Sequence, residues 1–505
     1  MVAKKNAMCY TKGMNKLRFY NTETRKKEEF KRVGKAKNAP VSVYSCGPTV
    51  YTYAHVGNLR AYIFVDVLVK VLRLNGFCVK HLINITDVGH LVSDSDEGED
   101  KVIKAARESG KSALEITQYF TDVFLSDIDL LNISRPDYLP RATNYISEMK
   151  ALVETLLDKG YAYEIKDAGL ESGIYFDVSK YKNYGKLSGQ KLEDKKSLSR
   201  DVLDVKGKRH PADFALWKAA PDNYLMKWDS KWGLGYPGWH IECSAMIHKL
   251  LGDTIDIHTG GIDHVPIHHE NERAQSESFT GKPLARFWLH NEFLLADGSK
   301  MSKSLGNAPT LTELVNDPSL NIGKFTPIQM QTLAPMAFRL FCLQTHYRQK
   351  LNFTHKALTA SAKAYLGLVD SVKKHYGGAF KVPKKSIDTY RASFVEALND
   401  DLATPKVIAL LFEVLKNQPS GEIYNLVQEF DKVLSLNLNI ENANRLLEKG
   451  ADKVEIPKDV IDLANDRLNA RQNKDWALSD KLRAEINEKG YEILDSKDGY
   501  NLKPR

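Results

Sequence analysis

The strongest constraint on the fold is a strand–helix–strand pattern between residues 41 and 86. The segment "VSVYSC", residues 41–46, is rich in β-branched and aromatic residues and ends at a "GPT" turn. Apolar residues near helical spacing then predict a helix from about Asn58 to Leu74, closed by Gly76. A second strand follows in "CVKHLINIT", residues 78–86. This succession favours a parallel α/β sheet.

The α/β pattern is interrupted once and then resumes. Residues 160–232 alternate in character and are punctuated by turns, which predicts an insertion. A helix in "WHIECSAMIHKLLG", a strand in "DTIDIHTGG" and a strand-like "FWLHNEFLLA" follow. From about Thr310 to Leu438 the chain is almost wholly helical, and a last helical unit fills residues 451–505. At 505 residues the chain is too long for one core.

Composition excludes several classes of protein. With 43% hydrophobic and 27% charged residues, the chain is typical of a soluble globular protein. It has no run of 18 apolar residues, so we expect no membrane span. The lysine-rich start lacks the apolar region of a secretory signal. Residues 1–22 contain no acid, which leaves a transit peptide as the alternative, but they have no Ser and little Arg, and we expect a cytoplasmic protein. Residues 1–40 hold 12 Lys+Arg against 3 Asp+Glu, which fits either a phosphate-binding arm or a solvated start.

The cysteines and one charged segment raise the question of a metal. The five cysteines are widely spread and form no CxxC pair, which excludes a disulfide framework and a zinc ribbon. In "VPIHHENERAQS", residues 265–276, a helix would project His268 and Glu272 from one face. A solvated helix start has the same composition. A metal site would need further ligands from distant segments.

Two segments are suited to phosphate. "HVGN", residues 55–58, stands at the start of a predicted helix, where free backbone N–H groups and the helix dipole favour anions. "DGSKMSKSLGN", residues 297–307, combines two lysines with serines and glycines and would stabilise a departing pyrophosphate. A turn before a helix and a solvated loop are the alternatives.

Together these motifs resemble a known family. "HVGN" resembles the HIGH signature, and "KMSKS" matches the second signature, of class I aminoacyl-tRNA synthetases. "YSCGPTVY", "PGWHIECSAM", "HTGGID" and "HHENERAQS" resemble the cysteinyl-tRNA synthetases in particular. The resemblance runs in order from about Val41 to Asn307. It implies a cysteine–tRNA ligase that uses L-cysteine, ATP with Mg²⁺, and tRNA-Cys.

The resemblance also implies one zinc ion per chain, held by Cys46, Cys243, His268 and Glu272. These are acceptable zinc ligands, although each cysteine taken alone would more often be a buried inert thiol. An apolar pocket would separate cysteine from serine only weakly. Zinc prefers thiolate to hydroxyl and deprotonates a bound thiol, so it would select the substrate by its sulfur.

Other roles follow from the same resemblance. The catalytic residues would be His55, Asn58, Lys300 and Lys303. ATP would contact His55, Gly57, Asn58, Gly260, Gly261, Asp263 and Lys303. The amino acid would contact Trp239, His258 and Thr49, with an ordinary core tryptophan as the alternative at position 239. Asn58 replaces the last signature histidine, and its amide can donate one hydrogen bond at similar reach.

The resemblance implies a monomer and a function for each predicted segment. Arg471, Trp476 and Asp480 would contact tRNA, unless the tryptophan packs inward on a surface helix. The predicted fold is a Rossmann-type parallel-sheet catalytic domain with an insertion, then a helical bundle and a small C-terminal domain. Its segments are the basic N-terminal extension (1–40), the catalytic halves (41–145 and 236–310), the connective insertion (146–235), the stem-contact and helical bundle region (311–450) and the anticodon-binding domain (451–505).

Three other functions compete with this interpretation. A ligase that activates cysteine and attaches it to an amino sugar would lack the C-terminal unit. A non-catalytic tRNA-binding protein need not keep "KMSKS" and four candidate ligands. A hydrolytic zinc enzyme is disfavoured because HExxH is absent and four protein ligands leave no water position.

Overall fold

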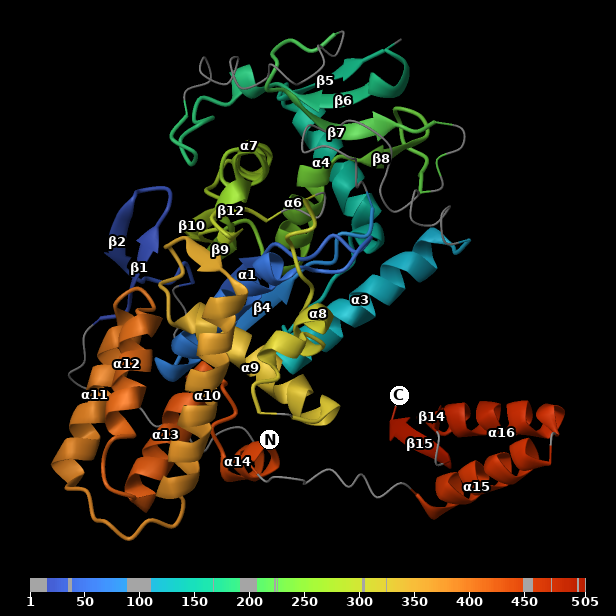
Figure 1. The fold of residues 1–505 in the computed structure, drawn as a ribbon. Helices are drawn as coiled ribbons and strands as arrows, with labels where there is room; N and C mark the ends of the chain where they lie inside the picture. Colours follow the sequence, from blue (N-terminus) through green and yellow to red (C-terminus); the bar gives the residue numbers. More distant parts are fainter. Residues whose placement is uncertain are drawn as a thin grey trace. The chain divides into compact units, whose positions relative to one another are not determined.

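The computed structural model describes residues 16–34, 39–88, 110–166, 168–190, 207–221, 224, 226–301, 305–323, 325–447, 457–473, 475–496 and 499–504. The chain divides into two compact units, Met1–Leu446 and Leu447–Arg505, which are described separately. Figure 1 shows the elements of both units, coloured along the sequence.

A four-stranded parallel sheet lies at the centre of the first unit (Figure 1). Its order is β10 (Ala285–Asn291), β9 (Ile255–Gly261), β3 (Val41–Ser45), β4 (Val79–Ile83). From β3 the chain continues to β4 on one side of the sheet, and from β9 it continues to β10 on the other side. The direction of the strand order therefore reverses between β3 and β9. In open parallel sheets, ligands bind outside the carboxyl ends of the strands at such a reversal.

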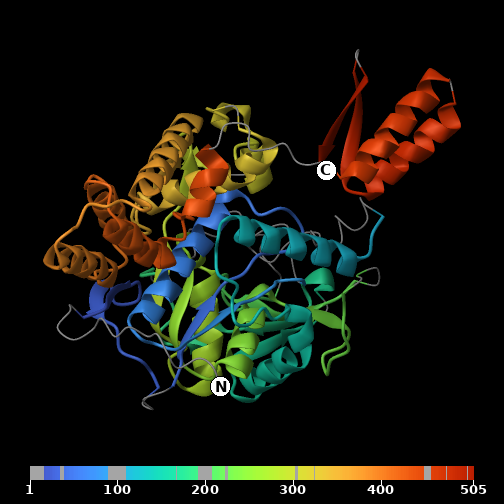
Figure 2. The same ribbon diagram turned by 90° about the horizontal axis from the view of Figure 1, so that it is seen from below.

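Helices complete the α/β core, which Figure 2 shows turned by 90°. α1 (Val56–Leu74) connects β3 to β4, α6 (Trp239–Leu250) precedes β9, and α7 (His268–Thr280) connects β9 to β10. Thirteen of the 19 residues of α1 are buried, because a helix beside a parallel sheet is apolar on most of its surface. The predicted helix from Asn58 is confirmed, beginning two residues earlier at Val56.

An N-terminal hairpin covers the outer edge of this sheet. It consists of β1 (Arg18–Asn21) and β2 (Lys26–Glu29), which are antiparallel. The Asn21 amide accepts from the Trp288 backbone N–H at 3.1 Å and donates to the Arg286 carbonyl at 3.1 Å. These bonds satisfy polar groups that an open strand edge would leave unpaired. Part of the basic N-terminal extension is therefore a packed element.

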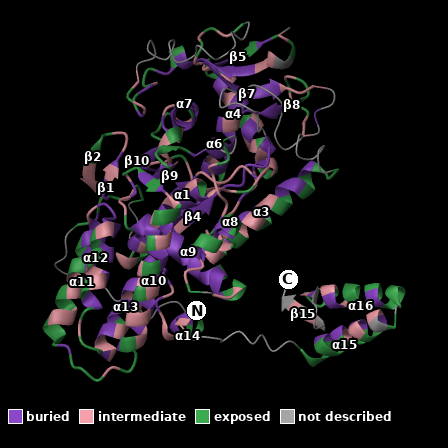
Figure 3. Cartoon of the chain, in the orientation of Figure 1, coloured by how far each residue is buried: buried purple, intermediate pink, exposed green. Residues whose placement is uncertain are grey.

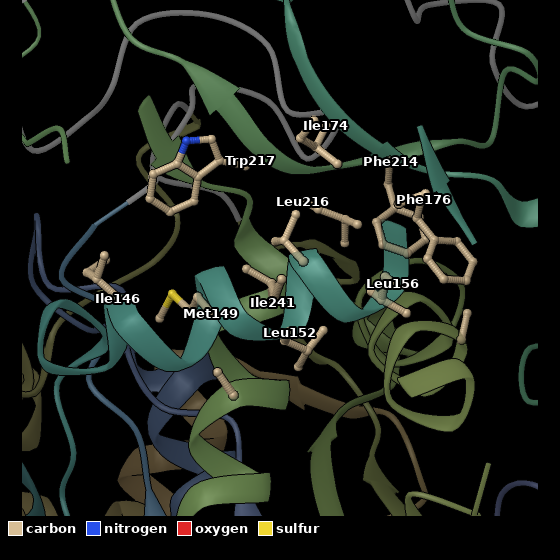
Figure 4. Packing of buried hydrophobic residues seen from close by; sticks show 14 of the residues in the cluster. Ile146, Met149, Leu152, Leu156, Ile174, Phe176, Phe214, Leu216, Trp217 and Ile241 are labelled. Carbon is tan, nitrogen blue, oxygen red and sulfur yellow. The ribbon is translucent and has the colours of Figure 1, made fainter. Parts of the chain in front are cut away.

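The segment predicted as an insertion forms an antiparallel sheet. Its strands are β5 (Ala162–Ile165), β6 (Gly173–Phe176), β7 (Phe214–Ala219) and β8 (Gly235–Pro237), in that order. α4 (Ile146–Asp158) packs under the sheet through Met149, Leu152 and Leu156, against Phe176, Leu216 and Ile241 (Figure 4). This shared core joins the insertion to α6, which carries one candidate metal ligand.

Helix α3 (Ala113–Leu130) contains a buried carboxyl group, and its burial should make stability depend on pH. The Asp127 residue is only 5% exposed, and burial raises the pKa of its carboxyl to about 7. The folded state therefore disfavours the ionised form. The free energy of unfolding falls as the pH rises from about 4, the pKa of this carboxyl in the unfolded chain, to about 7, its pKa in the folded protein. We expect Asp127→Asn to raise the unfolding temperature at pH 8 much more than at pH 5.

The free energy of unfolding of Asp127→Asn, relative to that of the wild type, is expected to rise by up to about 1.4 kcal/mol per pH unit and to level off above pH 7. Thermal unfolding at both pH values measures it. The matched control is Asp129→Asn, because Asp129 is exposed on the same helix and pairs with Arg135. A pH-independent difference at Asp127 would contradict the explanation.

The rest of the first unit is mainly helical, and its buried surfaces face the bundle interior (Figure 3). The short strands β11 (Leu294–Ala296), β12 (Ser299–Lys300) and β13 (Leu351–Phe353) form one sheet. The helices are α8 (Leu311–Val315), α9 (Pro327–Leu343), α10 (His355–His375), α11 (Lys384–Asn399), α12 (Thr404–Val414), α13 (Gly421–Leu434) and α14 (Ile440–Leu447). Short 3-10 turns span Ala142–Tyr145, Gly169–Glu171, Val178–Lys180, Ile262–His264 and Pro318–Leu320.

The second unit is a helical hairpin followed by a β-hairpin. It contains α15 (Lys458–Gln472), α16 (Trp476–Glu488), β14 (Tyr491–Ser496) and β15 (Gly499–Pro504). Val460, Ala464, Ile486 and Ile493 form its small core. The helical character predicted for this region is confirmed, and the terminal β-hairpin was not predicted.

Candidate metal centre and active site

The four predicted metal ligands converge at the reversal point of the sheet. Cys46 directly follows β3, Cys243 lies in the second turn of α6, and His268 and Glu272 lie one turn apart at the start of α7. One ligand atom from each residue lies within 4.8 Å of all the others. The Cys243 sulfur is 3.6 Å from His268 Nε2, and the Cys46 sulfur is 3.8 Å from Glu272 Oε1. The helical face predicted for His268 and Glu272 is confirmed.

The charges in this cluster compensate one another. Burial alone would raise the pKa of Glu272, but His268 and His258 outweigh it and hold that pKa far below its usual range. Burial opposes protonation of His268, yet Glu272, 2.6 Å away, raises its pKa to about 10. Burial also opposes ionisation of Cys243, but hydrogen bonds from Cys46 and His268 lower its pKa to about 6. Burial, the hydrogen bond with Cys243 and the charge of Glu272 raise the pKa of Cys46, so a metal cation would replace the protons of both Cys46 and His268.

A second set of donors surrounds the same point. Cys46, Glu272, His258 and His269 also offer ligand atoms within 4.8 Å of one another. His269 Nε2 lies 3.2 Å from the Cys46 sulfur, and its Nδ1 lies 2.7 Å from His290 Nε2. Sequence reasoning missed His269 and His290. The His268–His269 doublet was the available signal, since adjacent helical residues project about 100° apart and reach different neighbours.

Of the three residues predicted for the amino-acid pocket, Trp239 and His258 contact this cluster. Trp239, at the start of α6, is half-buried, and its ring stacks on His268 with centroids 4.3 Å apart. His258 is fully buried in β9, where its Nε2 lies 2.7 Å from Glu272 Oε2. His258 therefore orients a candidate ligand. Thr49 is half-buried in the segment after β3, and its backbone forms an isolated parallel β-bridge with Thr86.

The "HVGN" segment begins α1 at the same edge of the sheet. His55 is the N-cap, and its Nδ1 accepts from the Asn58 backbone N–H at 3.3 Å. The Asn58 side-chain oxygen accepts from the His55 backbone N–H at 3.2 Å, which completes a capping box. Asn58 thus fixes the histidine, a role that sequence reasoning did not foresee.

The two signature motifs meet at Gly57. A Cβ at this position would lie 2.8 Å from the His55 ring and 3.3 Å from the Met301 sulfur, so a larger residue would displace one of them. The Val56 backbone N–H donates to the Pro309 carbonyl at 2.9 Å, which joins the segment after "KMSKS" to the start of α1. Lys300 is exposed on β12. Lys303 lies outside the described residues.

The remaining predicted nucleotide contacts follow β9. A Cβ at Gly260 would lie 2.6 Å from the His269 ring, so only glycine allows this close approach. Gly261 ends β9, and Asp263 is exposed in the 3-10 turn that follows.

In the second unit, the three predicted tRNA contacts lie near the tip of the helical hairpin. Trp476 begins α16 and is 57% exposed, so it does not pack inward. The Arg471 guanidinium lies 5.6 Å from the centre of its ring. Asp480 is exposed one turn further along α16.

No helix in the described parts of the chain has the length and apolarity needed to span a membrane.

Comparison with known proteins places this chain in a family. A family profile described as "tRNA synthetases class I (C) catalytic domain" matches residues 32–363. A cysteine–tRNA ligase of Chlorobium chlorochromatii is 41% identical over 499 residues, 96% of this chain and 98% of that protein. One of Treponema denticola is 40% identical over 503 residues, 95% of this chain and 97% of that protein.

Among solved structures, Mycobacterium tuberculosis methionyl-tRNA synthetase bound by methionyl-adenylate is similar in fold. The TM-score is 0.53 at 16% identity, covering 79% of this chain and 90% of that one. The fold and the profile together define a class I tRNA synthetase. Within that class, the chain belongs to the cysteine–tRNA ligase family. The predicted family, the class I α/β fold and the expectation of an aminoacyl-tRNA ligase are confirmed.

Proposed function

We propose that this protein activates L-cysteine with ATP to cysteinyl-adenylate and transfers the cysteinyl group to the 3′-terminal adenosine of tRNA-Cys. The observation that carries the proposal is the convergence of two thiols, an imidazole and a carboxylate within 4.8 Å. This cluster lies at the same sheet edge as the N-terminus of α1. A cluster that can select a thiol and a helix N-terminus that can bind phosphate lie at one sheet edge. This arrangement is suited to an enzyme that joins cysteine to AMP.

The donor set of the cluster fits zinc. Thiolate, imidazole and carboxylate are its usual ligands, and Cys243 is buried with a pKa already lowered toward the thiolate. A zinc ion held by Cys46, Cys243, His268 and Glu272 would supply a borderline-soft Lewis acid that prefers the substrate thiolate to the hydroxyl of serine. The stacked ring of Trp239 restrains the orientation of His268, and the His258 contact restrains Glu272.

The N-terminus of α1 is suited to the phosphates of ATP with Mg²⁺. Because His55 Nδ1 accepts a backbone N–H, the neutral ring carries its proton on Nε2 and can donate it to a phosphate oxygen. Asn58 holds this ring through the capping box. Lys300 and Lys303 would neutralise the charge that builds on the pyrophosphate, while catalysis comes from positioning and charge stabilisation.

Replacement of Lys303 by alanine is expected to slow adenylation far more than it weakens cysteine binding. Its ammonium group would act on charge that develops in the transition state, so kcat should fall while KM for cysteine stays nearly constant. Cysteine-dependent ATP–pyrophosphate exchange measures both constants. Equal loss in both would argue against the phosphate role.

The second unit would supply tRNA recognition. The exposed ring of Trp476 can stack on an unpaired base, with Arg471 beside it to contact phosphate. By analogy with the family, we also place the enzyme in the cytoplasm as a monomer. An exposed tryptophan on a separate unit supports a tRNA ligase over a ligase for a small amino sugar.

Transfer of labelled cysteine onto unfractionated tRNA, with serine as the control, tests the proposed function. We expect charging with cysteine and none with serine. Charging with both amino acids would contradict selection by sulfur. Cysteine-dependent pyrophosphate exchange without any charging would instead indicate the small-molecule ligase.

A further inference from the structure

A half-buried histidine that sequence reasoning did not single out lies beside the amino-acid pocket. His264 ends the 3-10 turn between β9 and α7. Its ring centroid is 6.3 Å from that of Trp239 at an interplanar angle of 88°. The same ring is 5.2 Å from His268 and 5.1 Å from His269. His264 therefore lies beside the stacked pair of Trp239 and His268, within ring-contact distance of both.

The two nitrogens of this ring have different surroundings. Nδ1 faces the end of β9, because a Cβ at Gly260 would lie 2.8 Å from it. Nδ1 is buried and has no hydrogen-bond partner among the residues that the structure describes. A buried N–H without a partner is rarer and less favourable than a bare acceptor. The ring proton is accordingly assigned to the other ring nitrogen, Nε2.

The position and tautomer of His264 suit one group of the substrate. His264 and Trp239 are both half-buried, so they border an accessible part of the site. The carboxylate of an amino acid offers only hydrogen-bond acceptors, and its ammonium group offers only donors. We propose that His264 is a positioning residue whose Nε2–H donates to the α-carboxylate of the substrate cysteine. This inference rests on the proposed function and extends it.

Two thiol analogues separate this contact from the contact with sulfur. 3-Mercaptopropionate keeps the thiol and the carboxylate but lacks the amine, whereas cysteamine keeps the thiol and the amine but lacks the carboxylate. Calorimetric titration of each into the full-length, metal-loaded protein gives its Kd. In His264→Leu, we expect 3-mercaptopropionate to bind about 10-fold more weakly or worse, the loss of a hydrogen bond to a charged group. Cysteamine should change by less than about twofold.

Further variants separate a positioning role from a structural one. His264→Gln should restore most of the 3-mercaptopropionate affinity, because its amide can donate at similar reach. His248→Leu is the matched control, since His248 is also half-buried but lies at the far end of α6 near Asp253. It should leave both affinities unchanged. Metal content, measured by elemental analysis, should equal that of the wild type in all three variants.

The inference is overturned if both analogues lose affinity equally, if neither does, or if both His264 variants lose the metal. The last result would make His264 part of the metal scaffold. Cysteine-dependent pyrophosphate exchange by the wild-type protein tests the proposed function separately. If the wild-type protein catalyses this exchange but His264→Leu binds both analogues as the wild type does, the proposed function stands and only the proposed role of His264 is wrong.

Discussion

Cys243→Ser is expected to empty the candidate metal centre and abolish cysteine activation. Cys243 is 2% exposed, and its sulfur is mainly a thiolate at neutral pH because hydrogen bonds from Cys46 and His268 lower its pKa to about 6. A serine hydroxyl stays protonated and is a poor zinc ligand. Changes to groups that only orient ligands already cost about 10–100-fold in metal affinity, so loss of a ligand should exceed about 100-fold.

Metal content by elemental analysis and cysteine-dependent pyrophosphate exchange measure the effect. Cys342→Ser is the matched control, because Cys342 is a buried thiol of α9 whose pKa burial raises to about 12. The control should keep its metal and most of its activity. Full metal content in Cys243→Ser would disprove the proposed set of four ligands.

The second large effect is expected from a buried ion pair that joins α1 to α9. The Arg339 guanidinium is fully buried and lies 2.5 Å from the Asp66 carboxylate. It also donates to the carbonyls of Leu131 and Leu434. Asp66 also accepts from Lys70 at 2.7 Å. Asp66→Asn would remove the carboxylate that both cations contact and should lower the free energy of unfolding by about 3–5 kcal/mol.

The pH dependence of this effect has a definite sign. Burial would raise the pKa of Asp66, but Arg339 and Lys70 outweigh it and lower that pKa. The stabilisation is therefore present above the unfolded pKa of about 4 and is lost as the pH falls below it. Unfolding of the wild type and Asp66→Asn at several pH values measures it.

Asp370→Asn is the control, because the Asp370–Lys374 pair is exposed on α10 and should contribute less than about 1 kcal/mol. Similar losses from the two substitutions would contradict the role of burial.

The parts of the fold that depend on local pattern could be predicted from the sequence. The β-branched segment at residues 41–46 and the apolar helix after it are such parts, and so is the predicted helix that places His268 and Glu272 on one face. The order of the sheet was not predictable. Nothing local indicates that β9 pairs with β3, or that Asn21 would satisfy the outer edge of β10.

The candidate site shows the same division. Cys46 and Cys243 became ligand candidates only through the family resemblance, because 197 positions separate them and no spacing relates them. His269, His290 and His264 were missed, because the packing of β9, α7 and β10, and no local pattern, brings them beside the cluster. Asn58 was predicted from its place in the signature, but the capping box depends on the backbone geometry of His55.

The central claim is that a metal at this centre selects cysteine by binding its sulfur. X-ray absorption at the metal, recorded on the loaded protein without and with cysteine, tests it most directly. The account predicts two sulfur ligands from Cys46 and Cys243 in the free protein and one more when cysteine is added, with no change on adding serine. A sulfur count that stays the same with cysteine would contradict it.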